Sequence, residues 1–444
     1  MKRLVFDIFF LGVTAEVSGI SRFTVEVLRR ILEKDTFDIT LICSEDCEED
    51  VLRNFDNNFI NVRQQKNIKF QSKNIENYVL PSISTPKIKY KTFWGYLEER
   101  VLAVLPESKM LKIVVEKARA IKQKFISPYQ NYPVKRERSP LLERLIRDSD
   151  AYFSPFNIIV PEIDVNPQIR KLQVVHDLIP VLFPHWFPQN WLKNTINWNL
   201  ITPDVQVLAD SQCTKNDLLR NFPHIPEDKI TVIPLGADEH FHPCADEVKI
   251  NSVLKKYGVP QNVNYILSVA TLEIRKNFDH VIRSFAMLIE KYGHLFPNLR
   301  LVLTGKKGWL DKNIYSAYNK LTRKIRKRII FTGYVDEADI PFLYNGASCF
   351  CYMSFYEGFG LPPLEAMQSG IPVITSNTSS FPEVVGDAGI LLNPNDVDSL
   401  VNAFYRVLTD ENLRNEMITK GLEQAKKFNW DDCVNIICDK IING

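Results

Sequence analysis

Residues 349–394 read CFCYMSFYEGFGLPPLEAMQSGIPVITSNTSSFPEVVGDAGILLNP, and this stretch decides the fold. An apolar run at its start predicts a buried strand, which ends at a loop that contains two glycines. Pro362 and Pro363 mark the beginning of a helix, because the first helical turn tolerates proline. The apolar segment Ile371–Thr375 predicts a second buried strand. The stretch therefore predicts a strand, a glycine loop, a helix and a strand, as in parallel α/β proteins.

The glycine loop is a candidate anion site. Free N–H groups and the helix dipole at the start of a helix favour a phosphate there. Glu357 in the loop and Glu365 in the helix flank this position, and together with a phosphate they would suit a ligand with polyol hydroxyls. Taken singly, these glycines and glutamates would also fit an ordinary βαβ unit with surface carboxylates, but the complete pattern is more specific.

The complete pattern resembles a known donor site. E-G-F-G-L-P-P-L-E-A-M, then G-x-P-V-I, then P-E-V-V-G-D-A-G is similar to the E-x7-E region of retaining nucleotide-sugar glycosyltransferases of family 4. The resemblance implies an α/β fold of the GT-B type, with two Rossmann-like domains, a cleft between them and a C-terminal helix that crosses back. We expect an acceptor-binding domain over residues 1–240, with 429–444 packed on it, and a donor-binding domain over 241–428.

Length, charge and cysteine content agree with such an enzyme. A chain of 444 residues exceeds one hydrophobic core and is expected to form two domains. The net charge of +2 argues against a general nucleic-acid binder. The eight cysteines form no C-x-x-C pair, which favours reduced thiols in a cytosolic protein. There is no apolar run long enough for a transmembrane helix, and Asp7 interrupts the signal-like N-terminus.

The N-terminal half carries two further candidate regions. His176 and Asp177 follow an apolar strand, at the edge where open α/β sheets bind ligands. The H-D-L-I-P run resembles the second signature of the family, which places His176 beside the transferred sugar and lets Asp177 orient either the imidazole or the loop. The segment from Gly19 to Arg22 is similar to the first loop of the family, which approaches the donor phosphates and the acceptor. A plain helix start with an exposed arginine remains the alternative.

In the C-terminal half, Arg275 and Lys276 lie between a predicted strand and a predicted helix. Two adjacent cations there suit a diphosphate and can neutralise the charge that develops on a leaving nucleoside diphosphate. The segment also resembles the E-x-R-K-N element of the family. Because these cations supply the neutralising charge, we expect neither a metal nor a cofactor.

The resemblance assigns the remaining site residues. It implies that Glu357 positions the sugar ring, that Glu365 binds the ribose hydroxyls and that Tyr334 lies near the base. The other donor-binding positions are in the glycine loop, namely Gly358, Phe359, Gly360 and Leu361. The sequence D-V-D at 396–398 opens a predicted helix, so we interpret it as helix-capping charge and not as a metal ligand.

The expected reaction is transfer of a sugar to a hydroxyl with retention of configuration. The H-D-L-I-P run resembles that of bacterial mannosyltransferases of O-antigen and exopolysaccharide synthesis, which makes GDP-mannose the first donor to consider. The acceptor would be a glycan or a lipid-linked glycan. A sugar-nucleotide epimerase, a phosphorylase and a non-catalytic or membrane-docked protein stay open as alternatives. A nicotinamide dehydrogenase is disfavoured because the first glycine loop lacks G-x-G-x-x-G spacing.

One basic segment is not explained by the resemblance. Residues 86–147 contain fifteen Lys or Arg and six Asp or Glu. Within it, residues 108–125 mix apolar residues and lysines at helical spacing, as a surface for anionic membranes would. A solvated helix packed on the N-terminal domain is the alternative. We expect a cytoplasmic protein that is peripheral on the inner face of the membrane if the first interpretation holds.

Overall fold

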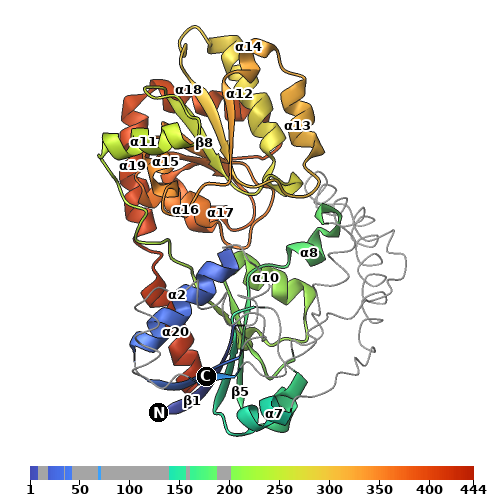
Figure 1. Ribbon diagram of the computed structural model, residues 1–444. Coiled ribbons are helices and arrows are strands. Elements are labelled where there is room, and N and C mark those ends of the chain that lie inside the picture. The colour runs from blue at the N-terminus through green and yellow to red at the C-terminus, as the bar shows by residue number, and fades with distance from the viewer. Residues whose placement is uncertain (9–18, 35, 43–68, 72–139, 157–160, 188–201) are drawn as a thin grey trace, which may run out of the picture.

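The computed structural model describes residues 1–8, 19–34, 36–42, 69–71, 140–156, 161–187 and 202–444. They form two α/β halves, one above the other in Figure 1. Each half is built on a parallel sheet, with strand order β3-β2-β1-β4-β5-β6-β7 in the first and β10-β9-β8-β11-β12-β13 in the second. Parallel sheets require helical crossovers on their faces, which is the pattern expected for two Rossmann-like halves.

The strands of the first sheet are β1 (Lys2–Asp7), β2 (Phe37–Ile42), β3 (Lys69–Gln71), β4 (Ala151–Ser154), β5 (Arg170–Val175), β6 (Gln206–Ala209) and β7 (Ile230–Val232). Those of the second are β8 (Tyr265–Val269), β9 (Arg300–Thr304), β10 (Ile329–Gly333), β11 (Cys349–Tyr352), β12 (Val373–Ser376) and β13 (Ile390–Leu392). We propose that the two halves divide near residue 240.

The helices around the first sheet are α2 (Gly19–Glu33), α7 (Pro140–Arg147), α8 (Ile179–Leu182), α10 (Gln212–Asn221) and α20 (Trp430–Asn443). The second half contains α11 (Glu247–Lys256), α12 (Phe278–Tyr292), α13 (Lys312–Asn319), α14 (Arg323–Arg326), α15 (Ile340–Asn345), α16 (Leu361–Gln368), α17 (Phe381–Val385), α18 (Val397–Thr409) and α19 (Glu411–Ala425). Short 3-10 helices are η3 (Pro161–Val165), η4 (Pro184–Trp186), η6 (Glu227–Lys229), η7 (Ile274–Lys276) and η8 (Gly386–Ala388).

Strand β11 shows why apolar and polar residues do not alternate along these strands. Phe350 and Tyr352 belong to the core on one face of the second sheet, whereas Cys349 and Cys351 belong to the core on the other face. Successive side chains of a strand point to opposite faces, so a strand covered on both sides needs apolar residues at every position. All four residues are accordingly buried.

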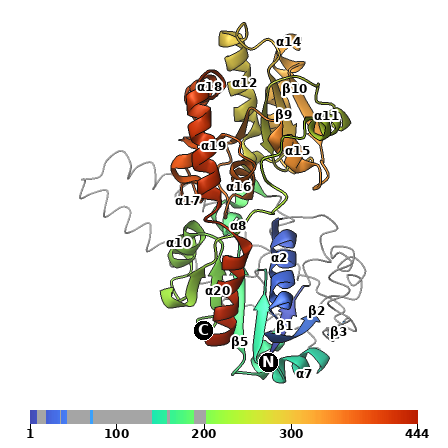
Figure 2. The ribbon, with the colours of Figure 1, turned by 90° about the vertical axis from the view of Figure 1, so that its left-hand side faces the viewer.

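The C-terminal helix α20 returns to the first half and lies beside α2 (Figures 1 and 2). Arg30 Nε on α2 lies 2.9 Å from Asp431 Oδ1, and the ring of Phe23 packs 6.1 Å from that of Trp430. The crossing helix needs close backbone approach, because a Cβ at Gly236 would come within 2.6 Å of the Trp430 nitrogen. The expected return of the C-terminus is thus confirmed.

Local predictions for residues 349–394 and for the D-V-D sequence that follows them also hold. Helix α16 begins with prolines in its first turn and is followed by Gly370, whose φ of +74° is the left-handed conformation typical after a helix end. Asp396 caps α18 through its side chain, which accepts a hydrogen bond from the Ser399 N–H. The D-V-D sequence therefore serves as a helix start.

Residues 86–139 of the basic segment lie outside the described ranges, so the proposed membrane surface has no structural description. The end of the segment is α7, whose Leu142 and Ile146 are buried against the first sheet. In the part of the chain that the structure describes, no helix has both the length and the apolar character needed to cross a bilayer.

Candidate active site

The candidate site lies where the loops after β8 and β11 meet. Asn277 joins them, because its side-chain amide donates to Met353 O at 3.0 Å and to Pro394 O at 2.7 Å. Its φ of 58° is left-handed, a conformation that asparagine tolerates better than most residues. The E-x-R-K-N segment therefore holds its two cations in a fixed turn, η7.

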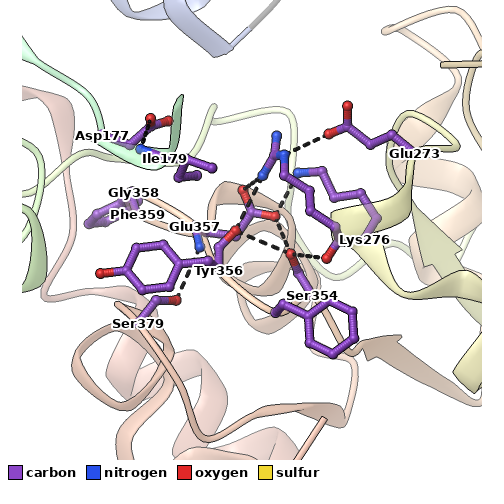
Figure 3. A network of polar contacts seen from close by, with 12 residues as sticks. Asp177, Ile179, Glu273, Lys276, Ser354, Tyr356, Glu357, Gly358, Phe359 and Ser379 are labelled. Carbon is purple, nitrogen blue, oxygen red and sulfur yellow. Dashed lines mark hydrogen bonds and ion pairs between the residues drawn. The ribbon is translucent and has the colours of Figure 1, made fainter. Parts of the chain in front are cut away.

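Glu357 is the centre of the cluster of charges shown in Figure 3. Its Oε1 accepts from Lys276 Nζ at 2.6 Å, and its Oε2 accepts from an Arg275 guanidinium nitrogen at 2.7 Å. The hydroxyls of Tyr352 and Ser354 donate to Oε1 at 3.0 and 2.7 Å. The structure thus brings together three of the four residues that the sequence named as catalytic.

A second carboxylate completes the balance of charge. Glu273 Oε1 forms an ion pair with Arg275 Nε at 2.7 Å, without the angle of a hydrogen bond. Burial by itself raises the pKa of Glu357, but the charges of Arg275 and Lys276 outweigh burial and lower it to about 2. Burial and the neighbouring Arg275 lower the pKa of Lys276, against the opposite effect of Glu357. The cluster is therefore buried and combines two basic with two acidic side chains.

His176 lies on the opposite wall, at the end of β5. Its Nδ1 is 2.7 Å from Asp210 Oδ2 and its Nε2 is 2.9 Å from Pro155 O. A carbonyl oxygen only accepts, so Nε2 carries a proton. Burial lowers the pKa of His176, but Asp210, the Pro155 carbonyl and Asp177 together raise it by more, and the net result is a raised pKa.

Asp177 holds the loop and not the imidazole. Its Oδ1 accepts from the Ile179 N–H at 2.9 Å, whereas Asp210 binds the histidine. Of the two roles left open for Asp177, the structure shows the loop contact. Burial raises the pKa of Asp177 by more than the Arg275 charge lowers it.

The two walls touch at Gly358. A Cβ at this position would lie only 2.0 Å from His176 O, so the contact requires glycine. The Gly358 carbonyl accepts from Ser211 Oγ at 2.6 Å, and the N–H of Gln212 donates to the Glu383 carboxylate at 2.9 Å. The glycine loop therefore packs directly on the N-terminal half.

Arg22 and Glu365 bind each other instead of standing apart. Glu365 accepts hydrogen bonds from an Arg22 guanidinium nitrogen and, at 3.0 Å, from the Tyr344 hydroxyl. Arg22 also reaches Glu337 at 3.4 Å. This pair joins α2 of the first half, which begins at Gly19, to α16 of the second.

The other predicted donor-binding residues lie around these clusters. Gly360 has a φ of +111° and precedes α16, and Leu361 is its first residue. Phe359 is buried, with its ring 5.6 Å from that of Phe428. Tyr334 lies farther off on the loop after β10, half exposed, with Lys306 Nζ 4.4 Å from its ring centroid.

Sequence reasoning missed several polar partners. Asp210 and Tyr352 are not among the site residues predicted from the sequence, yet they contact His176 and Glu357. Glu273 carried a usable signal, because it is the acidic position of the E-x-R-K-N element and stands two residues before Arg275. No comparable local signal identifies Asp210, which lies 34 residues from His176.

Comparison with known proteins identifies a family and relatives of this chain. Residues 250–424 match the family described as Glycosyl transferases group 1. The chain is 34% identical over 267 residues to O-antigen chain mannosyltransferase B of Escherichia coli, covering 60% of this chain and 68% of that protein. It is 28% identical over 305 residues to the serotype-specific mannosyltransferase WbdA of E. coli, covering 68% of this chain but only 36% of the relative.

Solved structures show the same fold. The Anabaena protein Alr3699/HepE, crystallised with UDP and glucose, has a TM-score of 0.62 at 15% identity over the whole of both chains. WaaG, a glycosyltransferase involved in lipopolysaccharide biosynthesis, has a TM-score of 0.55 at 14% identity over 99% of this chain and all of its own. The expected GT-B fold is confirmed. The fold, the cation cluster and the similarity to the E. coli enzymes together show that the chain belongs to the group 1 glycosyltransferase family.

Proposed function

We propose that the protein is a retaining, family 4-like transferase that moves mannose from GDP-mannose to a hydroxyl of a glycan or lipid-linked acceptor in cell-surface polysaccharide synthesis. The observation that carries this proposal is the buried turn in which Arg275 and Lys276 face Glu357. The names of the E. coli relatives favour mannose and an O-antigen-like acceptor.

The two cations would hold the diphosphate and stabilise its departure. Donors fixed in a site that excludes water need no reorganisation when charge develops on the leaving group. Backbone N–H groups at the start of α16, around Gly360, would add the positive end of the helix dipole. With this charge in place, we propose that transfer requires no bound metal.

Glu357 would position the sugar while it keeps the cations in place. Its Oε1 already accepts from Lys276, Tyr352 and Ser354, whereas the described partner of Oε2 is Arg275. A carboxylate offers about four acceptor positions in all, so Oε2 retains room for a sugar hydroxyl. Glu365 would bind the ribose hydroxyls once Arg22 releases it.

His176 would contact the sugar from the opposite wall. Its Nε2 proton now reaches Pro155 O, and in the donor complex it would exchange this carbonyl for a sugar hydroxyl. Asp210 would keep the ring oriented and supports its positive charge. The histidine would thus add a hydrogen-bond donor opposite Glu357.

A thermal-shift screen with GDP-, UDP-, ADP- and dTDP-sugars tests the donor site. A ligand present at 100 times its Kd adds about 2.7 kcal/mol of stability. A shift with GDP-mannose followed by transfer to a mannose acceptor, with the anomer assigned by NMR, is the expected result. Stabilisation by another nucleotide class alone would replace the proposed donor, and no shift with any of them would contradict a nucleotide-sugar site.

We also propose that the basic segment 86–147 docks the enzyme on anionic membrane at the inner face. Each basic residue near such a surface contributes about 1 kcal/mol, and salt screens the attraction. Sedimentation with vesicles of anionic lipid should show binding that weakens with salt. Vesicle binding that is absent or indifferent to salt would leave this segment a structural insertion.

A further inference from the structure

A cavity of about 400 Å³ lies beside the transfer site and is lined by residues from both halves of the protein. Ile274 and Phe355 contribute to its wall, and each directly precedes a residue of the active-site loops, Arg275 and Tyr356. None of the charged residues of the Glu357 cluster lines it. Its volume lies within the range of about 300–1,000 Å³ that small-molecule sites occupy.

One wall of the cavity is aromatic. The rings of Trp186 and Phe355 lie nearly parallel, with centroids 6.0 Å apart and planes 20° apart. Trp186 is also stacked on Phe183 at 4.2 Å, and its carbonyl oxygen accepts from Trp309 Nε1 at 2.9 Å. The platform is therefore held from both halves before any ligand arrives.

The other walls carry polar groups that lack partners. Within the described chain, the side chains of Asn313, Asn395 and His185 have no recorded hydrogen bond, and all three are exposed. His280 is only 1% exposed, and its Nε2 also lacks a partner among the described residues. An unsatisfied buried polar atom costs about 1–3 kcal/mol, which a ligand or an ordered water at this place would recover.

These groups fit a neutral sugar better than an anion. Flat aromatic rings pack on the C–H faces of a pyranose, and amides and imidazoles pair with its hydroxyls. The cationic side chain in the lining, Arg283, is already paired with Asp279 at 2.8 Å. Burial lowers the pKa of His280 to about 4, with Arg283 acting in the same direction, so this imidazole is neutral at physiological pH.

We propose that this cavity is a carbohydrate subsite that binds sugar residues of the acceptor glycan behind its reacting end. The cavity lies between the segment that follows His176 and the segment that precedes Glu357. A glycan whose terminal hydroxyl reaches the transfer site can continue along it. The inference rests on the proposed function for the identity of the glycan, but the cavity and its unpartnered groups do not depend on the donor.

Acceptor length is the decisive variable in the test. Transfer from GDP-mannose is measured with methyl α-mannoside and with an α-linked mannotetraose, for the wild type, Asn395→Ala and Asn313→Ala/Asn395→Ala. The expected result is a KM for the tetraose that rises about tenfold in the double variant, equivalent to about 1.4 kcal/mol. The kcat, the KM for GDP-mannose and the KM for methyl α-mannoside should stay the same.

Two further variants provide a control and a larger expected effect. Asn415→Ala removes an exposed amide from α19, outside the cavity, and should leave every constant unchanged. Trp186→Ala should weaken tetraose binding further, provided that its thermal unfolding matches that of the wild type. Equal tetraose KM values in the wild type and the double variant would overturn the subsite.

Binding without donor separates this inference from the proposed function. Saturation-transfer NMR with mannotetraose should show a signal in the wild type that the double variant loses. If no nucleotide sugar supports transfer but this difference remains, the proposed function fails and the subsite stands. If transfer occurs but neither tetraose kinetics nor tetraose binding responds to the variants, the subsite fails and the function stands.

Discussion

Glu357 and Glu365 stand eight positions apart in one motif, yet their surroundings differ in kind. Glu357 is held by Arg275, Lys276, Tyr352 and Ser354, all from the C-terminal half. Glu365 is held by Tyr344 from its own half and by Arg22 from the other. The contacts of Glu357 lie within one half and do not depend on the other, whereas the Arg22–Glu365 contact exists only when the halves are together.

The different surroundings of Glu357 and Glu365 suit two different roles, stabilisation of the leaving group and exchange of partners when a ligand enters. A cluster built within one half keeps its geometry through substrate entry and product release, as leaving-group stabilisation requires. A pair formed between halves can exchange its partners when a ligand enters, because each group is reached once the halves move apart. We therefore expect substitutions at Glu357 to affect chemistry and stability, and substitutions at the Arg22–Glu365 pair to affect opening and donor binding.

The largest expected effect comes from the intradomain cluster. Lys276→Ala removes a cation next to the proposed leaving group and should lower kcat by about 10²–10³-fold, as the loss of one such donor does. Steady-state kinetics with the donor identified by thermal shift measures it. Lys255→Ala, an exposed lysine on α11, is the control. An unchanged kcat for Lys276→Ala would remove the cation from the mechanism.

Glu357→Gln tests the same cluster by stability. The pKa of Glu357 is lowered from 4.5 to about 2, so its charge stabilises the fold fully above pH 4.5 and loses this effect as the pH falls toward 2. The variant should be less stable by about 3 kcal/mol near pH 7, with a gap that closes across that window. Denaturant unfolding at several pH values measures the gap, with exposed Glu290→Gln as the control. A gap independent of pH would contradict the assigned charge balance.

Asp210→Asn extends the comparison to the N-terminal half, where the buried pair of His176 and Asp210 also lies within one half. A hydrogen bond to a charged group contributes about 1.5–3 kcal/mol, so kcat should fall about 10- to 100-fold. Because the pKa of His176 is raised, its stabilisation is complete below about pH 6.5 and lost as the pH rises through the folded value. The stability gap to the wild type should thus shrink at alkaline pH, and Asp148→Asn, at an exposed position, should show none. A kcat equal to that of the wild type would make Asp210 purely structural.

The smallest effect on stability is expected at the pair between the halves. Arg22→Ala should cost no more than about 1 kcal/mol, because opening lets water reach Glu365. The radius of gyration without ligand, measured by X-ray scattering, should increase as the halves separate. Arg29→Ala changes an exposed arginine on the same helix and is the matched control. An unchanged radius in Arg22→Ala would show that other contacts, such as Ser211 with Gly358, hold the halves together.

One local prediction fails. Acidic residues favour the first turn of a helix, so the run from Asp336 to Asp339 predicts a helix start there, but α15 begins at Ile340 with no acidic residue in its first turn. The carboxylates of Asp336 and Asp339 instead meet Lys256 Nζ at 2.7 and 2.6 Å. Pro341, which prefers the first turn, fixes the start of the helix, and the acids serve a contact with α11 that no local pattern predicts.

The sequence by itself determined the buried strands, the starts of helices such as α16 and α18 and the residue types at the site, because these depend on short-range periodicity and backbone preference. Pro362 marks the start of α16 and Gly370 follows its end. Asn277 adopts the left-handed conformation that ends the turn carrying Arg275 and Lys276. Only the tertiary structure decided which side chains of the site contact one another. Asp210 contacts His176 from 34 residues away, and Arg22 contacts Glu365 from 343 residues away. A buried charge without a partner is unfavourable, so the partner of each charge is the group that the fold places beside it.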